Sequence, residues 1–201
     1  MKTTAVTSVF NCMSGNSGLT EEFIYTKIAT KGPLYEVLSS ATTGVSRLGF
    51  IPMCILDNGR ALRVFEGKHG ILIARNGKAG QMSYLKPSNY TINDHAYILS
   101  LRDDFKKEKG IVTPDRERRF LLWFICTFQS RLYEYASKTA NATWNKSDFL
   151  KMTIDLPTLE AIDETAKLYE DCLHTMSEAQ QILNLLDGLL HKQISSTSEG
   201  T

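Results

Sequence analysis

A heptad pattern runs through residues 158–193 and constrains the fold more than any other feature of the chain. Its positions alternate at spacings of four and three residues and are occupied by Ile162, Ala166, Tyr169, Leu173, Met176, Gln180 and Leu183. Asp187 breaks this register, and Leu186 and Leu190 continue the apolar stripe with a slip. Pro157 suits the first turn of a helix. The pattern predicts one continuous helix of about 50 Å, at about 1.5 Å per residue.

Such a helix either packs along its own domain or projects and pairs with another helix. A single apolar stripe with acidic residues elsewhere favours the projecting, pairing helix. The residues expected on its pairing face are Ile162, Ala166, Tyr169, Leu173, Met176, Leu183, Leu186 and Leu190. The polar tail, residues 194–201, is expected to be disordered.

Charge is distributed unevenly along the chain. Residues 158–193 carry seven acids and two bases, a net charge of −5. With Glu199 counted and a total of +1, residues 1–157 carry +7. The small total argues against a uniformly basic nucleic-acid binder, but a basic body and an acidic arm suggest different partners for each. The alternative is that the acids only solvate the helix.

The four cysteines argue against a metal site. Cys12, Cys54, Cys126 and Cys172 are widely spaced, without a Cys-x-x-Cys pair or a histidine at ligand spacing. Cys126 lies in the apolar run LLWFICTF and is expected to be a core thiol. The sequence shows neither a signal peptide nor a membrane-spanning stretch, so a cytoplasmic protein without membrane contact is expected.

Residues 1–157 alternate short apolar runs with turn signals, which predicts a strand-rich globular domain. The runs are LYEVLSS, FIPMCIL, ALRVF and HAYILSL, separated by turns such as Thr43-Gly44 and Asp57-Asn58-Gly59. Residues 116–137 then show apolar residues at helical spacing, whereas 102–119 is charge-dense and expected to be a loop. The expected fold class is α+β, with one strand-rich domain followed by one long C-terminal helix.

Catalytic motifs are absent from the sequence. GKHGILIARNGKAG lacks the spacing of a phosphate-binding loop, and Ala79 follows Lys78 where that motif has Ser or Thr. Asn93-Asp94-His95 could supply a base, but no nucleophile or metal-ligand partner stands at a recognisable spacing. No catalytic residue is therefore predicted. An enzyme with an unfamiliar site around Asp94 and His95 remains an alternative, which predicts turnover that His95→Ala would abolish.

Several segments, taken together and in the order in which they occur along the chain, resemble the target-recognition domain of type I restriction–modification specificity subunits. The two most informative are GILIARNGKAG, residues 70–80, and TINDHAYIL, residues 91–99. NSGLTEEFIY and GPLYEVLSSATTG are similar to the family's opening segment, and ATWNKSDFLKMTIDLP is similar to its closing one. The resemblance implies a recognition domain over residues 1–157, a spacer and dimerisation helix over 158–193, and no catalysis by the chain itself.

The same resemblance implies a set of partners. The chain would bind double-stranded DNA at a bipartite target and direct an adenine methyltransferase subunit there, together with a restriction subunit. The methyltransferase would use S-adenosylmethionine, and the chain itself would need no cofactor. Family members usually contain two recognition domains and two long helices, so this chain resembles a half-subunit. It would form an antiparallel coiled coil as a homodimer, or with a different half-subunit. An orphan or decoy DNA binder is the alternative.

Chemistry then assigns roles within the recognition domain. Arg75, Asn76 and Lys78 are the residue types that read base edges or hold phosphates. Expected to position this loop are Gly77, Gly80, Asn93, Asp94 and His95. A second basic stretch is expected to contact phosphates and contains Lys106, Lys107, Lys109, Arg116, Arg118 and Arg119. A solvated loop is the alternative for that stretch. Trp144, Asn145 and Lys146 could cap the domain near DNA, or Trp144 could be buried.

Overall fold

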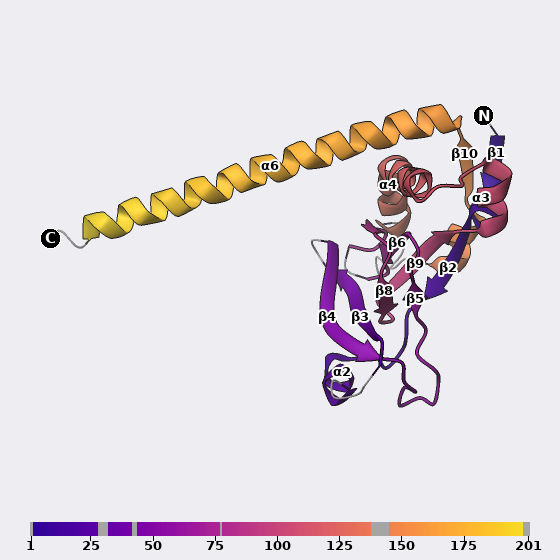
Figure 1. The fold of residues 1–201 in the computed structure, drawn as a ribbon, viewed down its shortest axis with the longest axis horizontal. Helices are drawn as coiled ribbons and strands as arrows, with labels where there is room; N and C mark the ends of the chain where they lie inside the picture. The colour runs from indigo at the N-terminus through magenta and orange to yellow at the C-terminus, as the bar shows by residue number, and fades with distance from the viewer. Residues whose placement is uncertain (1, 28–31, 42–43, 77, 138–144, 199–201) are drawn as a thin grey trace.

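A body of packed sheets and helices carries one projecting helix in the computed structural model, which describes residues 2–27, 32–41, 44–76, 78–137 and 145–198 (Figure 1). The strands are β1 (Lys2–Ala5), β2 (Phe10–Ser14), β3 (Leu34–Ala41), β4 (Gly44–Pro52), β5 (Phe65–Glu66), β6 (Gly70–Ala74), β7 (Met82–Leu85), β8 (Asn89–Ile92), β9 (Ala96–Leu101) and β10 (Thr153–Leu156). The helices are α1 (Val6–Val9), α2 (Glu21–Lys27), α3 (Asp103–Lys109), α4 (Pro114–Ser137), α5 (Lys146–Lys151) and α6 (Leu159–Ser198).

The described strands form two four-stranded sheets and one two-stranded sheet. Their orders are β2–β9–β6–β7, β4–β3–β8–β5 and β1–β10. All neighbours are antiparallel except β3 and β8. The pair β1–β10 joins the first strand to the strand that directly precedes α6. This mixture of sheets and helices, followed by a long C-terminal helix, confirms the predicted α+β class.

Strand β6 is buried along its whole length because the first sheet is covered on both faces. Ile71 and Ile73 belong to the core shared with α4, whereas Leu72 between them belongs to the core shared with the second sheet. This alternation follows the two-residue period of a strand. A third cluster, centred on Phe23, Ile24 and Ile51, lies where α2 packs on the far end of the second sheet.

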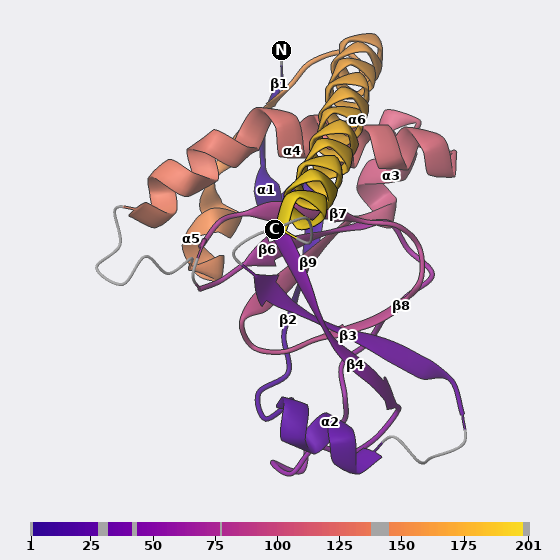
Figure 2. The same ribbon diagram turned by 90° about the vertical axis from the view of Figure 1, so that its left-hand side faces the viewer.

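Helix α4 is covered by the first sheet on one side and by the start of α6 on the other (Figure 2). Residues 121–125 are therefore all buried, which explains the continuous apolar run LLWFI. Further along, the rings of Phe124 and Phe128 stack with their centroids 4.6 Å apart. The predicted helix at 116–137 is confirmed, with two additional residues at its N-terminal end.

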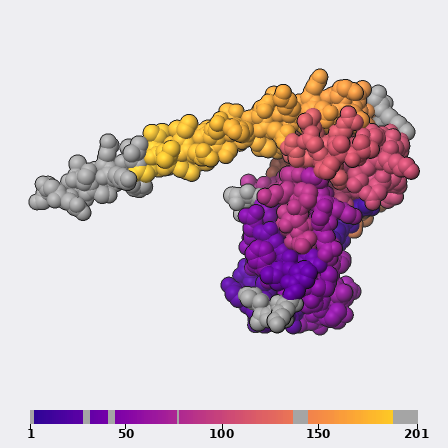
Figure 3. Space-filling view, viewed as in Figure 1, coloured from indigo at the N-terminus to yellow at the C-terminus, as the bar shows by residue number. Residues whose placement is uncertain are grey.

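Helix α6 contains 40 residues, about 60 Å at about 1.5 Å per residue. Its first turns pack on the domain: Ile162 and Ala166 are buried in the core, and Tyr169 is half-buried against it. Every residue from 171 to 188 is exposed, and this part stands clear of the body (Figure 3). The first part of the helix thus packs along its own domain and the rest projects; pairing of the projecting part with another helix stays a prediction. Placing Ile162 and Ala166 on a pairing face was wrong, because the chain's own core already covers them.

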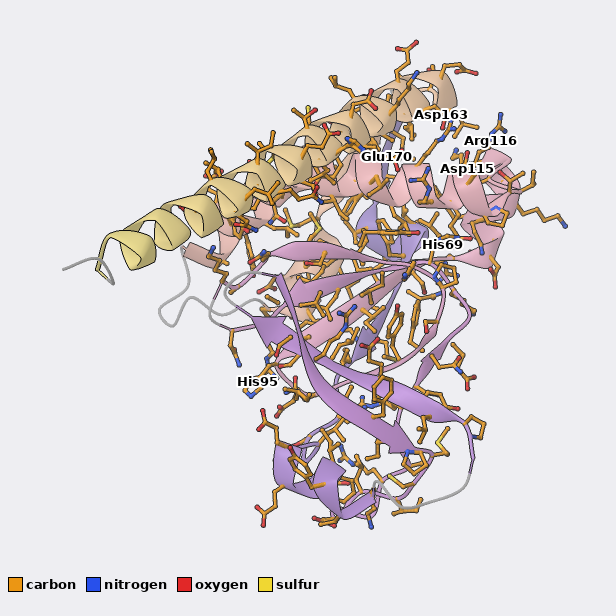
Figure 4. All side chains as sticks on the ribbon, turned by 60° about the vertical axis from the view of Figure 1, so that its left-hand side comes forward. His69, His95, Asp115, Arg116, Asp163 and Glu170 are labelled. Atoms are coloured by element: carbon orange, nitrogen blue, oxygen red, sulfur yellow. The ribbon has the colours of Figure 1, made fainter. Side chains whose placement is uncertain are left out.

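Two arginines of α4 also form ion pairs with the part of α6 that packs on the domain, which we call its root. Arg118 pairs with Glu170, and Arg119 Nη1 lies 3.8 Å from Asp163 Oδ1. Both guanidinium groups also contact Asp115 one turn earlier on α4, at 3.1 and 3.0 Å. The labelled side chains of Asp115, Asp163 and Glu170 accordingly gather where α4 meets α6 (Figure 4). These ion pairs add charge complementarity to the apolar contact at the joint.

Glu170→Gln is expected to lower the free energy of unfolding by about 0.5 kcal/mol, since the Arg118–Glu170 pair is partly exposed and screened. Urea denaturation at low salt measures this change. Glu164→Gln, at an exposed position of the same helix, should leave the unfolding free energy unchanged. Equal effects of Glu170→Gln and Glu164→Gln would contradict a specific pair.

Three predictions made from the sequence are wrong: a loop, a buried thiol and the end of the long helix. Residues 102–119 are not a loop: they form α3, which ends at Gly110 in the left-handed conformation, and the start of α4. Cys126 is exposed: it lies near Cys172 of α6, where α6 itself is already exposed. The long helix continues to Ser198 rather than ending at residue 193, so residues 194–198 are helical.

In the part of the chain that is described, no helix is long and apolar enough to span a membrane.

Candidate DNA-contacting surface

Two turns that lie far apart in sequence meet at one edge of the first sheet. The β6–β7 connection begins at Arg75, and the β8–β9 turn ends at His95. Strands β6 and β9 are antiparallel neighbours, and Ala74 pairs with Ala96. This register places Arg75 directly beside His95. The β6–β9 pairing therefore joins the segments around Arg75 and His95 into one surface.

Hydrogen bonds hold the two turns together. The Arg75 backbone N–H donates to the His95 carbonyl at 2.8 Å, and Arg75 Nη1 donates to the Asp94 carbonyl at 3.2 Å. Asn76 Nδ2 lies 2.8 Å from His95 Nδ1 and donates to it. Arg75 and Lys78 remain exposed beside these bonds. The predicted positioning role of His95 thus agrees with its contacts, and Asn76 also holds the loop.

The far end of the β6–β7 loop is attached to α4. Gly80 has φ of +86°, and a Cβ there would lie 2.9 Å from the Leu132 carbonyl oxygen, so glycine is required on both grounds. Gln129 of α4 donates to the Gly80 carbonyl at 2.9 Å and accepts from Met82 N at 2.8 Å. The position of Gly77 lies outside the described residues.

A buried polar group supports the β8–β9 turn from below. The Asn16 side chain donates to the Thr91 hydroxyl at 2.9 Å and to the Ile92 carbonyl at 3.1 Å, and it accepts from Arg63 N at 2.9 Å. The turn itself is closed by Asn93, whose side-chain oxygen accepts from His95 N at 3.2 Å. This contact is compatible with the positioning role expected of Asn93, which stays a prediction.

A polar surface depression of about 430 Å³ lies beside the β8–β9 turn. The second sheet contributes Ser39, Ser40 and Ser46, and the start of α2 contributes Glu21. Asp94 and His95 line the opposite side, with side chains 47% and 54% exposed. His95 projects at the edge of the domain on the side toward which α6 extends (Figure 4). A long ligand lying beneath α6 would meet this depression together with Arg75 and Lys78.

The second basic stretch lies elsewhere. Figure 4 shows Arg116 and His95 on opposite sides of the domain. Arg118 and Arg119 face α6, and Lys106 is bound by Asp103 at 3.0 Å and Glu117 at 3.4 Å. Of the remaining three bases, Lys109 pairs with Glu108 at 2.8 Å, Arg116 donates to the Gly110 carbonyl at 3.3 Å, and Lys107 is exposed. The stretch therefore does not extend the surface around Arg75. Lys106, Arg118 and Arg119 instead form ion pairs within and between helices.

The segment before α5 is structural where it is described. Asn145 caps α5 by accepting from Ser147 N at 2.9 Å, and Lys146 donates to the Cys12 carbonyl at 2.8 Å. Burial raises the pKa of the Cys12 thiol to about 11, partly offset by the Lys146 ammonium group, so this thiol stays protonated at neutral pH. Trp144 lies outside the described residues, as does the side chain of Leu190.

The Asp94–His95 geometry does not resemble a catalytic dyad. Asp94 Oδ1 lies 3.9 Å from His95 Nε2, beyond hydrogen-bonding distance, and Asn76 occupies the other ring nitrogen. Among the described residues, no three His, Cys, Asp or Glu side chains are arranged to hold a metal ion. The surface presents donors and acceptors but lacks the oriented base that proton abstraction needs.

Comparison with protein-family models and with curated sequences finds no match. Comparison with solved structures finds ten similar chains, three of which follow. One is the HsdS subunit from Thermoanaerobacter tengcongensis, with TM-score 0.57, 15% identity and coverage of 90% of this chain and 39% of that one. A second is the type I restriction–modification S subunit from M. genitalium, with TM-score 0.52, 18% identity and coverage of 90% and 42%.

The third similar chain comes from a study of the assembly and conformational transition of a type I restriction–modification system. Its TM-score is 0.63 at 16% identity, with coverage of 95% of this chain and 43% of that one. The fold of this chain therefore matches that of a specificity subunit, as the sequence resemblance predicted. The chain spans about two fifths of the length of these neighbours.

Proposed function

We propose that this chain is the DNA-recognition component of a type I restriction–modification system and performs no catalysis itself. The observation that carries the proposal is the fold shared with three specificity-subunit structures over at least 90% of the chain. The surface formed by Arg75, Lys78 and the β8–β9 turn supports it, because that surface offers side chains suited to base edges and phosphates. The bound substrate would be double-stranded DNA, in the cytoplasm.

The exposed part of α6 supports a second element of this proposal, a helix pair. The stripe that packs on α4 at Ile162 and Ala166 continues past the domain as Leu173, Met176 and Leu183, with nothing among the described residues covering it. An apolar stripe on an exposed helix is satisfied by a second helix with the same stripe. We propose that a second copy of the chain supplies it, antiparallel, so that two recognition domains address two DNA half-sites.

The partner enzymes follow from the same proposal. An adenine methyltransferase subunit would carry S-adenosylmethionine and the chemistry, and a restriction subunit would join through it. Affinity capture of the tagged chain from its native host, followed by mass spectrometry, tests this assembly. Recovery of a stoichiometric adenine methyltransferase is the expected result, and mapping of methylated sites would then give the target. Recovery of the chain with DNA alone would replace the proposal with the orphan binder.

Arg75→Ala is expected to weaken binding to the target duplex by about 1–3 kcal/mol and to relax the preference at one base pair, if the guanidinium reads a base. Fluorescence anisotropy on the target and on single-substitution duplexes measures both effects. Lys86→Ala, an exposed lysine on the β7–β8 connection, is the comparison for charge. A uniform loss on all sequences, with a shallower salt dependence, would make Arg75 a phosphate contact instead.

A further inference from the structure

We propose that Asp94 and His95 are specificity residues that read an exocyclic amino group together with a neighbouring acceptor on a base-pair edge. This inference rests on the proposed DNA-recognition function and deepens it. Its basis is that the two side chains present an acceptor and a donor side by side, 3.9 Å apart, on an exposed part of the surface. From their sequence context alone, these residues are expected only to position the loop.

The contacts of the His95 ring define its donor. Asn76 Nδ2 donates to Nδ1, so the neutral imidazole carries its proton on Nε2. The Asp94 carboxylate, 3.9 Å from Nε2, favours the same tautomer, because a nearby negative charge stabilises an N–H more than a lone pair. His95 thus presents an N–H donor at the surface, held in place by Asn76 and by the backbone bond from Arg75.

The Asp94 carboxylate is available to a ligand. Its backbone carbonyl accepts from Arg75, but its side chain makes no hydrogen bond with the described residues. A carboxylate on a DNA-facing surface is repelled by phosphates and by base acceptors, so it favours binding only where a base offers a donor. The Asp94 side chain is therefore unsuited to contacts with the DNA phosphates and suited to discrimination between bases.

The donor and acceptor pair restricts the base edges that fit. In the major groove, adenine presents the N7 acceptor beside the N6 amino group, and a G·C pair presents guanine O6 beside the cytosine N4 amino group. Both offer the amino group that Asp94 requires and the acceptor that His95 requires. The adjacent N7 and O6 acceptors of guanine offer no donor to Asp94. The shared ligand chemistry is thus an exocyclic base amino group next to an acceptor.

Selection from randomised duplexes by the full-length chain tests the inference. The wild-type chain is expected to require an amino-bearing base at one position of its preferred site. Asp94→Ala is expected to reduce discrimination at that position by about ten- to a hundred-fold and to leave other positions unchanged. The variant should fold, since the carboxylate makes no hydrogen bond with the described residues, and a thermal melt checks this. Glu21→Ala removes a carboxylate from the same depression and is the matched control.

Base analogues in the preferred duplex identify the amino group. Purine in place of adenine removes N6, and 2-pyrimidinone in place of cytosine removes N4. One of the two is expected to weaken wild-type binding about tenfold or more, and Asp94→Ala is expected to show no further loss on that analogue. Loss on the purine duplex assigns adenine, and loss on the pyrimidinone duplex assigns cytosine.

The outcomes separate this inference from the function it rests on. If Asp94→Ala changes affinity equally on all sequences, as Glu21→Ala should, the carboxylate acts through its charge alone and the inference is overturned while DNA recognition stands. If neither analogue weakens binding, the inference also fails. If the wild-type chain selects no sequence at all, the proposed function and the inference fall together.

Discussion

Replacing Leu173 and Leu183 together by Asp is expected to convert a dimer of this chain into a monomer at micromolar concentration. Both side chains lie on the exposed part of α6, 43% and 55% exposed. Burying a leucine contributes about 1.5–3 kcal/mol, and two copies would lose four such side chains. The dissociation constant of the dimer should therefore rise by at least about a thousand-fold. Light scattering combined with sedimentation equilibrium measures the change.

The control for this prediction is Gln181→Asp, which adds one charge on the same exposed helix outside the stripe of Leu173, Met176 and Leu183. It should leave the dimer intact. Circular dichroism should show that both variants keep the folded domain, because Leu173 and Leu183 do not belong to its core. A wild-type chain that is monomeric at micromolar concentration, and that neither DNA nor a partner subunit brings into a dimer, would overturn the second-copy proposal.

Gly15→Ala is expected to lower the free energy of unfolding by about 3 kcal/mol and to abolish specific DNA binding. A Cβ at this buried position would lie 1.7 Å from the Asn93 carbonyl oxygen and 3.0 Å from the Asp94 Cα. Both neighbours are backbone atoms, so the β8–β9 turn itself must move. That movement would separate Asp94 and His95 from Arg75. Urea denaturation and duplex binding measure the two effects.

Gly188→Ala provides a comparison of opposite sign. Gly188 lies inside α6, and an added Cβ would meet nothing within 4 Å. Alanine should stabilise the helix there by about 0.5–1 kcal/mol. A Gly15→Ala protein as stable as wild type, with unchanged duplex binding, would show that the turn tolerates displacement and would remove the reason for linking Gly15 to the DNA-contacting surface.

Periodicity in the sequence predicted the elements whose environment is uniform. The continuous apolar run GILIA is typical of a buried strand and corresponds to β6, and the helical spacing at 116–137 identified α4. The heptad pattern identified α6 but could not divide it, because the same stripe serves an intramolecular contact at Ile162 and an exposed face at Leu173. Which part of α6 is covered depends on how far α4 extends beneath it in the folded domain, and the heptad pattern does not encode that packing.

The DNA-contacting surface was predictable only in part, for the same reason. Arg75 and His95 were identified separately, yet their adjacency depends on the β6–β9 register. Asn16 and Gln129 were missed because their partners stand about 47–76 residues away in the chain. The phosphate contacts expected of the second basic stretch stay a prediction, because local composition shows the number of charges and not the acids on α3, α4 and α6 that pair with them.

The joint between α4 and α6 has a mechanical consequence. From Tyr169 to Ser198 the helix extends about 43 Å beyond its root, at about 1.5 Å per residue. A rotation of about 5° at that root moves the far end by about 4 Å, close to the rise of one base pair, about 3.4 Å. In the proposed dimer, the helix would act as a lever. The precision with which two half-sites are spaced would then depend on the angular stiffness at Ile162, Ala166 and Arg118 as much as on helix length.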